Sequence, residues 1–177
     1  MRLCFLIINA LFFSGCYVLK NKAMEKHEFS FSTDYGQFYV EDKGNMEDTG
    51  SPSFWNEEAF NGRLALGQGV IGVGIQKSYG NVKGEIEVLK QPNSNIDYSQ
   101  YDHIVEGGVI IQSGELQILD CPNNQLELSL KINSGKYRVR VYSSNLASVK
   151  DRDSPSETDD DYYRIEIWPS EEMGRKV

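Results

Sequence analysis

The sequence predicts an all-β protein: an antiparallel β-sandwich of about eight strands with one short helical turn. Two runs near the C terminus, Lys136–Asn145 and Tyr162–Pro169, alternate between apolar and polar residues with period two, as half-buried strands do. Short runs of this kind recur along the chain between turns of Gly, Asn and Ser, and the sequence lacks the long amphipathic runs of a helical protein. This pattern of many short strands is typical of a sandwich.

The strand-like runs follow one another through the whole domain. In chain order they are Glu28–Ser32, Gln37–Val40 (a second strand or a continuation of the first), Val70–Gln76, Glu85–Lys90, Tyr101–Glu106, Val109–Gln112, Glu115–Leu119, Gln125–Ile132, Lys136–Asn145 and Tyr162–Pro169. Because Ser113-Gly114 favours a tight turn, we expect Val109–Gln112 and Glu115–Leu119 to form a hairpin.

A single helical turn is expected at Ser53–Phe60. Ser53 is placed to cap its beginning, and Gly62 is placed to close its end. We expect its aromatic residues to cover one end of the core; they are Phe54, Trp55 and Phe60.

The segment Gly67–Gly72 (GQGVIG) matches the G-x-G-x-x-G fingerprint of dinucleotide-binding proteins. That fingerprint requires a helix beginning at its last glycines, whereas Val70–Gln76 continues as an apolar, β-like run. We therefore interpret the segment as a glycine-rich strand, and we expect no cofactor.

The composition describes one globular domain with an acidic surface. The chain has 177 residues and a formal net charge of −8, so it can bury a core of its own but would repel nucleic acid. A basic protein is the partner that this charge favours. The oligomeric state does not follow from the sequence.

The N terminus resembles a bacterial lipoprotein signal. Arg2 precedes an apolar run, Leu3–Phe13, which is too short to span a bilayer but fits the apolar region of a secretory signal. The residues Phe13-Ser14-Gly15-Cys16 are similar to a lipobox, in which cleavage precedes a Cys that then carries lipid; an ordinary cleaved signal is the alternative. We expect a signal peptide at 1–15, a membrane anchor at Cys16, a tether at 16–27 that includes His27, and a sandwich domain at 28–177. The predicted location is the cell envelope, with the outer membrane or periplasmic face favoured.

No catalytic constellation stands out. His103 is the one histidine inside the domain, and with Asp102 and Glu106 it could act as a base or a metal ligand, but neighbouring residues of a strand point to opposite faces. We expect a structural or surface histidine and neither a catalytic residue nor a metal site. Cys121, which has no basic neighbour in sequence, is interpreted as a structural thiol.

The connector between the last two strands, residues 150–161, has the highest density of charge. Three interpretations stay open: a solvated loop, an acidic surface for a basic partner, and a metal site, although its spacing fails the EF-hand pattern. Tyr and Trp next to charge are common anchors of interfaces. The candidate partner-binding residues are Asp151, Asp153, Glu157, Asp159, Asp160, Asp161 and Tyr162.

Several segments together are similar to the family of competence protein J (ComJ)-like domains. They are Asp34–Val40 (DYGQFYV), the Trp55–Ala59 turn, the glycine-rich strand, Tyr101–Glu106 (YDHIVE), Gly135–Val141 (GKYRVRV) and Tyr163–Pro169 (YRIEIWP). The family's named member inhibits a DNA-entry nuclease. The resemblance implies a β-rich protein that is not an enzyme and that binds and blocks another protein.

These observations favour a lipid-anchored envelope protein that inhibits a basic nuclease or toxin, in the manner of an immunity protein. Two alternatives stay open. One is an envelope hydrolase or metal-dependent enzyme that uses His103 and nearby carboxylates, and the other is a structural or accessory lipoprotein.

Overall fold

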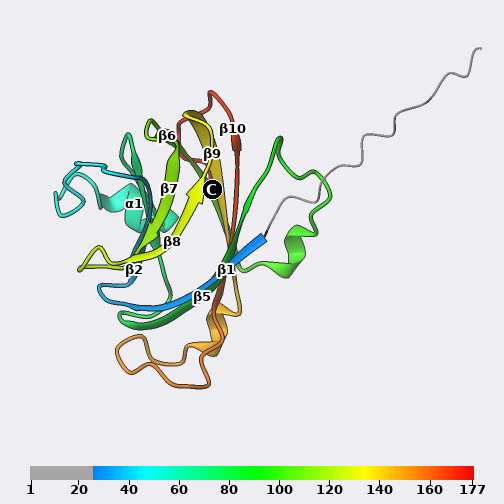
Figure 1. Cartoon of the computed structure of the whole chain (residues 1–177). Helices are drawn as coiled ribbons and strands as arrows, with labels where there is room; N and C mark the ends of the chain where they lie inside the picture. Colours follow the sequence, from blue (N-terminus) through cyan, green and yellow to red (C-terminus); the bar gives the residue numbers. More distant parts are fainter. Residues whose placement is uncertain (1–25) are drawn as a thin grey trace, which may run out of the picture.

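The computed structural model describes residues 26–177, which form two five-stranded sheets packed face to face (Figure 1). The sheet here called the β9 sheet has the order β1 (Lys26–Thr33), β5 (Gly80–Val88), β10 (Tyr162–Pro169), β9 (Gly135–Ser144) and β6 (His103–Ile111). The β2 sheet has the order β3 (Leu64–Leu66), β4 (Val70–Gly74), β2 (Gln37–Asp42), β7 (Glu115–Leu119) and β8 (Leu126–Lys131). The predicted all-β sandwich is confirmed.

The pairing of the strands is antiparallel except at one place. The predicted C-terminal pair is present, with Ile165 opposite Val141 in an antiparallel register. On its other side β10 runs parallel to β5, and this parallel pair makes the β9 sheet a mixed one. The first three residues of the glycine-rich segment Gly67–Gly72 form the turn after β3, and the last three begin β4, so the predicted β-like run from Val70 is confirmed.

The core lies between the sheets because the period-two pattern sends alternate side chains inward. From β10 these are Tyr163, Ile165 and Ile167, all fully buried. The ring of Phe38 from β2 meets that of Tyr163 edge-on, with centroids 6.2 Å apart. A smaller cluster on the outer face of the β2 sheet is covered by the segment that carries α1 (Glu57–Gly62).

The predicted hairpin between Val109–Gln112 and Glu115–Leu119 is wrong. Val109 belongs to β6 in the β9 sheet, while β7 pairs with β2 and β8 in the other sheet. The Ser113-Gly114 turn therefore carries the chain across the sandwich. Asp42 holds it there by accepting hydrogen bonds from the backbone N–H groups of Gln112 and Ser113.

The helical turn begins later than predicted. Asn56, and not Ser53, is the N-cap, since its side chain accepts from the Ala59 N–H at 2.9 Å. Gly62 is the last helical residue, and Arg63 takes the left-handed cap conformation in place of the predicted glycine. The remaining helical turns are η1 (Tyr98–Gln100) and η2 (Leu146–Ser148).

Residues 1–25 lie outside the described part of the chain, and with them the predicted signal peptide, the Cys16 anchor and most of the tether. The last two residues assigned to the tether, Lys26 and His27, already pair with Glu87 and Ile86 of β5. None of the helices among residues 26–177 has the length and apolarity needed to cross a membrane.

Candidate functional site

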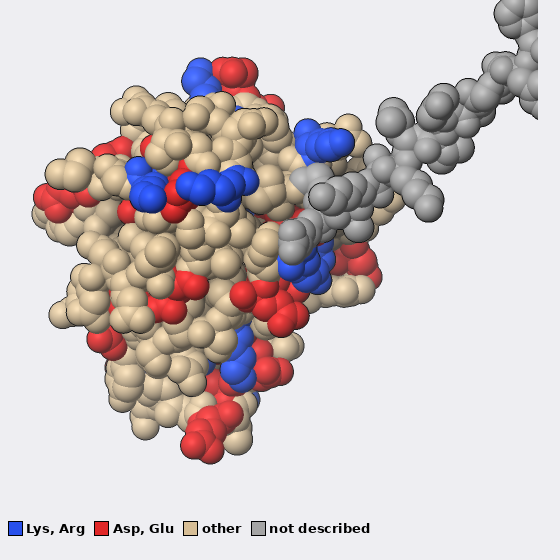
Figure 2. Space-filling model, viewed as in Figure 1, with Lys and Arg blue, Asp and Glu red and all other residues tan. Residues whose placement is uncertain are grey.

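The loop of residues 150–161 connects η2 to β10 and lies at one end of the sandwich (Figure 1). Figure 2 shows acidic side chains at that end. The structure divides the predicted partner-binding residues into two groups. Four carboxylates are exposed, namely Asp151, Asp153, Glu157 and Asp160. None of the four forms an ion pair within residues 26–177, so this surface has negative charge free to meet a partner.

Asp161 is directed into the protein. It is 2% exposed, and its Oδ1 lies 2.7 Å from Nζ of Lys77, which is 4% exposed. This contact is an ion pair without the geometry of a directed hydrogen bond. Oδ2 accepts a hydrogen bond from the hydroxyl of Tyr163 at 2.9 Å, and burial together with the Asp161 charge raises the pKa of that hydroxyl. The Asp161 carboxylate thus joins the loop to the core and is withdrawn from the surface.

Asp159 and Tyr162 also make internal contacts. The buried Asp159 carboxylate accepts from the Ser156 N–H at 2.9 Å and closes a turn within the loop. The Tyr162 hydroxyl donates to Glu85 at 3.0 Å on the outer face of the β9 sheet. Burial and this neighbouring carboxylate raise the pKa of Tyr162 to about 12. The exposed acidic surface therefore contains fewer of the loop residues than the sequence predicted.

The exposed part of the loop is fixed to the turn that follows β4. The Ser78 N–H donates to the Arg152 carbonyl at 2.8 Å, and the Ser78 hydroxyl donates to Asp153 at 2.5 Å. The Tyr79 hydroxyl reaches the Asp153 carbonyl at 3.0 Å. These contacts restrict the backbone of the loop, which lowers the entropy that binding a partner would cost.

A groove of about 740 Å³ lies beside this fixed part of the loop. Its walls come from the β1–β2 turn, the segment of Trp55 and α1, the turn after β4, Pro122, and Arg152 of the loop. A second hollow of about 600 Å³ continues it and shares Tyr35, Trp55 and Phe60 with it. The loop and the groove together form one surface.

Three aromatic side chains of the groove are exposed: Tyr35 by 74%, Phe60 by 65% and Tyr79 by 46%. Phe60 was predicted to cover one end of the core together with Phe54. Phe54 is buried as predicted, but Phe60 is exposed, so the prediction is wrong for Phe60. No motif in the sequence marks Tyr35 or Tyr79 as part of a binding site. Their only local signal was a position in or beside a turn, which does not distinguish a groove from ordinary surface.

Two groove residues have a backbone conformation that residues other than glycine rarely adopt. Tyr35 has φ 57° and Arg63 has φ 54°, both in the left-handed region. This conformation costs L-residues roughly 1–2 kcal/mol each. The surrounding hydrogen bonds hold it, among them Gly36 N–H to the Ser78 carbonyl and Ile75 N–H to the Gly36 carbonyl, both 2.8 Å. Strain of this kind concentrates at functional sites.

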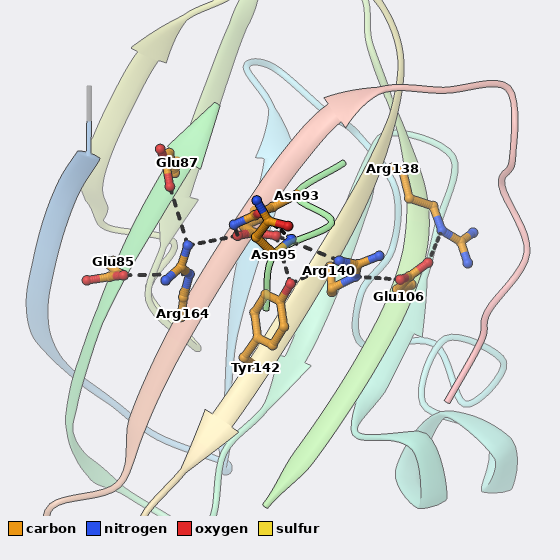
Figure 3. A network of polar contacts seen from close by, with 10 residues as sticks. Glu85, Glu87, Asn93, Asn95, Glu106, Arg138, Arg140, Tyr142 and Arg164 are labelled. Carbon is orange, nitrogen blue, oxygen red and sulfur yellow. Dashed lines mark hydrogen bonds and ion pairs between the residues drawn. The ribbon is translucent and has the colours of Figure 1, made fainter. Parts of the chain in front are cut away.

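A second charged cluster covers the outer face of the β9 sheet (Figure 3). Arg140 donates to Glu106 at 2.5 Å and Arg138 donates to the other oxygen of Glu106 at 2.9 Å. Burial alone would raise the pKa of Glu106, but the hydrogen bonds from the two arginines outweigh it and lower that pKa. The carboxylate therefore stays ionised.

Glu166 continues this network beneath the segment of residues 89–102. It is fully buried and accepts from Arg164 at 2.8 Å and from the Tyr142 hydroxyl at 2.7 Å. Asn93 reaches it at 3.4 Å, and the Tyr101 ring packs on Tyr142 with centroids 4.6 Å apart. Each of these charged groups thus has a partner. The network joins neighbouring strands of the β9 sheet and holds the segment of residues 89–102 over them.

The side chains that a hydrolase or metal-dependent enzyme would use bind different partners and not one another. The His103 Nε2 lies 3.1 Å from the Gly62 carbonyl, Asp102 accepts from the Leu146 N–H at 2.8 Å, and Glu106 is held by arginines. Among residues 26–177 no three His, Cys, Asp or Glu side chains are grouped to hold a metal ion. Cys121 is buried, with its Sγ 3.4 Å from the Tyr39 hydroxyl, as a structural thiol would be.

Comparison with protein-family models gives no match, and comparison with curated protein sequences gives none either. Two solved structures are similar. ComJ from Bacillus subtilis, described as an inhibitor of the DNA degrading activity of NucA, has a TM-score of 0.59 and 18% identity, covering 84% of this chain and 98% of its own. The crocagin biosynthetic gene J protein has a TM-score of 0.53 and 16% identity, covering 83% and 98%. The chain therefore has a ComJ-like fold.

Proposed function

We propose that this chain is a lipid-anchored protein of the cell envelope that binds and inhibits a basic protein, such as a nuclease or a toxin, and is not itself an enzyme. The fold supports an inhibitor, because the similar ComJ blocks the DNA degrading activity of another protein. The four exposed carboxylates of the loop support a basic partner. The anchor rests on the sequence Phe13–Cys16, which lies outside the described residues.

The arrangement of the loop carries the proposal. Its exposed carboxylates form no ion pair with any residue of 26–177, stand on a backbone fixed by Ser78 and Tyr79, and adjoin exposed aromatic rings. Charge of one sign steers a partner of the opposite sign, and aromatic residues supply the contact energy at the centre of an interface. In contrast, the charges on the outer face of the β9 sheet already pair with one another.

Charge reversal at two exposed carboxylates of the loop tests the proposal. The variant Glu157→Lys/Asp160→Lys changes two exposed carboxylates, and Glu28→Lys/Glu172→Lys makes the same change of net charge at exposed positions elsewhere. Secreted and envelope fractions of the source cells would be assayed for DNA degradation and for toxicity with each protein added. We expect inhibition by the wild type and the control, and inhibition weakened about tenfold or more, with a smaller salt dependence, for the loop variant.

Two results would contradict the proposal. If the loop variant and the control inhibit equally, the acidic loop is not the contact surface. If the wild type inhibits no activity and retains no basic protein from these fractions at low salt, the inhibitory function itself is wrong. Labelling with palmitate in cells, compared between the wild type and Cys16→Ser, tests the anchor separately.

A further inference from the structure

We propose that the groove is a binding site for an organic anion in which an aromatic ring stands next to a carboxylate. This inference goes beyond the inhibitory function, because it concerns the groove residues and a small anionic ligand and does not involve the exposed carboxylates or a basic protein. Unpaired cations, buried donors without acceptors and exposed rings all meet there.

The first feature is a pair of arginines without carboxylate partners. Among the six arginines of residues 26–177, four form ion pairs: Arg138, Arg140, Arg164 and Arg175. The two that form none in this part of the chain, Arg63 and Arg152, both line the groove. Asp34 is the one acidic residue in the same lining, so the charged side chains of the lining sum to +1 in a protein of net charge −8. Guanidinium groups bind carboxylates with two parallel N–H donors.

The second feature is a pair of buried donors without acceptors. The indole Nε1 of Trp55 and the Nη1 of Arg63 have no hydrogen-bond partner within the described structure. The other nitrogen of the guanidinium, Nη2, donates to the Gln76 side chain, which fixes the orientation of the group. Buried donors are almost always paired, so an unpaired donor on each of two residues that line the groove is unusual, and each has hydrogen-bonding capacity left for a ligand.

The third feature is the ring surface. Tyr35, Phe60 and Tyr79 are exposed at this site, and the Phe60 ring packs on Trp55 with centroids 5.4 Å apart. A ligand ring can stack on such a wall in the offset geometry that aromatic pairs prefer. The volume of about 740 Å³ suits a small molecule or the end of a peptide.

An aromatic ring next to a carboxylate occurs both in free small-molecule acids and at the C terminus of a peptide, and two probes distinguish these sources. N-acetylphenylalanine supplies the free acid, and the peptide Gly-Gly-Gly-Phe supplies the same group at a chain terminus; the amide of each compound is its neutral control. Binding to the purified protein would be measured by titration calorimetry. The indole N–H signals of the two tryptophans would be followed by NMR, with Trp168 as an internal control because its ring packs on Arg140 outside the groove.

We expect each acid that binds to do so about tenfold or more tightly than its amide, since the amide loses the charge-assisted contacts. The Trp55 N–H signal should move with the acids, and the Trp168 signal should not. Tighter binding of the peptide acid identifies a chain terminus as the ligand, and equal binding of both acids identifies a small molecule.

Arg152→Gln is the main test variant, because its side chain is exposed and forms no ion pair within residues 26–177. Arg63→Gln is the second, with an unchanged melting temperature as the check of folding. Lys150→Gln removes a cation two residues from Arg152 that does not line the groove. The arginine variants should lose the preference for acid over amide, and Lys150→Gln should keep it. No binding of either acid at millimolar concentration, equal binding of acid and amide, or an unchanged preference in Arg152→Gln would overturn the inference.

Discussion

Replacing Asp161 by Asn separates the structural carboxylates of the acidic loop from its surface carboxylates. The substitution keeps the size of the side chain but leaves the Lys77 ammonium, 4% exposed, without its counter-charge 2.7 Å away. Removing one partner of a buried ion pair costs roughly 3–5 kcal/mol, because the other charge stays buried. Asn can still accept from the Tyr163 hydroxyl, so we expect the lower end, about 3 kcal/mol.

The assay is equilibrium unfolding in guanidinium chloride together with a thermal melt. For a domain of this length each kcal/mol lowers the Tm by roughly 2–4 °C, which gives a fall of about 6–12 °C for Asp161→Asn. Asp160→Asn is the matched control, since that neighbouring carboxylate is exposed and should change stability by less than about 0.5 kcal/mol. In the double variant Lys77→Met/Asp161→Leu much of the loss should be recovered, because no unpaired charge remains. Equal stability of Asp161→Asn and Asp160→Asn would refute the reasoning.

Two further predictions concern the sandwich itself. Hydrogen bonds from Lys131, then Ser129 and Lys43, lower the pKa of Glu115 to about 2; because the unfolded value is roughly 4.3, this stabilisation is complete above that pH and is lost as the pH falls towards 2. Chemical unfolding of Glu115→Gln should therefore show a deficit at neutral pH that shrinks on acidification, and a constant deficit would contradict the ion-pair interpretation. In Gly84→Ala the new Cβ would lie 2.2 Å from the Tyr163 carbonyl of the adjacent strand, so we expect a loss of about 3 kcal/mol. Gly174→Ala, with open space around it, should unfold like the wild type, and equal midpoints for the two variants would count against the tight packing.

Local patterns predicted the strands but not which strands meet. The alternation in Lys136–Asn145 and Tyr162–Pro169 predicted β9 and β10 because one face of each is apolar along its length. The Ser113-Gly114 turn was misread, since a tight turn at a glycine serves a hairpin and a crossing between sheets equally well. The crossing turn is held by the carboxylate of Asp42, about seventy residues earlier in the chain, which accepts hydrogen bonds from the N–H groups of the turn.

The candidate site was predictable only in part, for the same reason. The charge of the loop is visible in the sequence, but the burial of Asp161 depends on Lys77, which comes from the turn after β4. The groove combines five segments that are separate in the chain, each too short to give a signal of its own. Residues such as Tyr35 become informative only when the fold shows that the surrounding core does not cover them.

The two proposals are coupled through Arg152. This residue stands between Asp151 and Asp153 in the loop and also lines the groove. A carboxylate bound in the groove would neutralise Arg152 and make the loop more negative by about one charge. At roughly 8 Å in a water-like medium one unit charge changes the interaction with a cationic partner by about 0.5 kcal/mol, or about twofold in affinity. Because such coupling is reciprocal, a basic partner should tighten the binding of the anion by the same factor, and Arg152→Gln should abolish both effects. A ligand that weakened the partner's binding would instead show that the two compete for one surface.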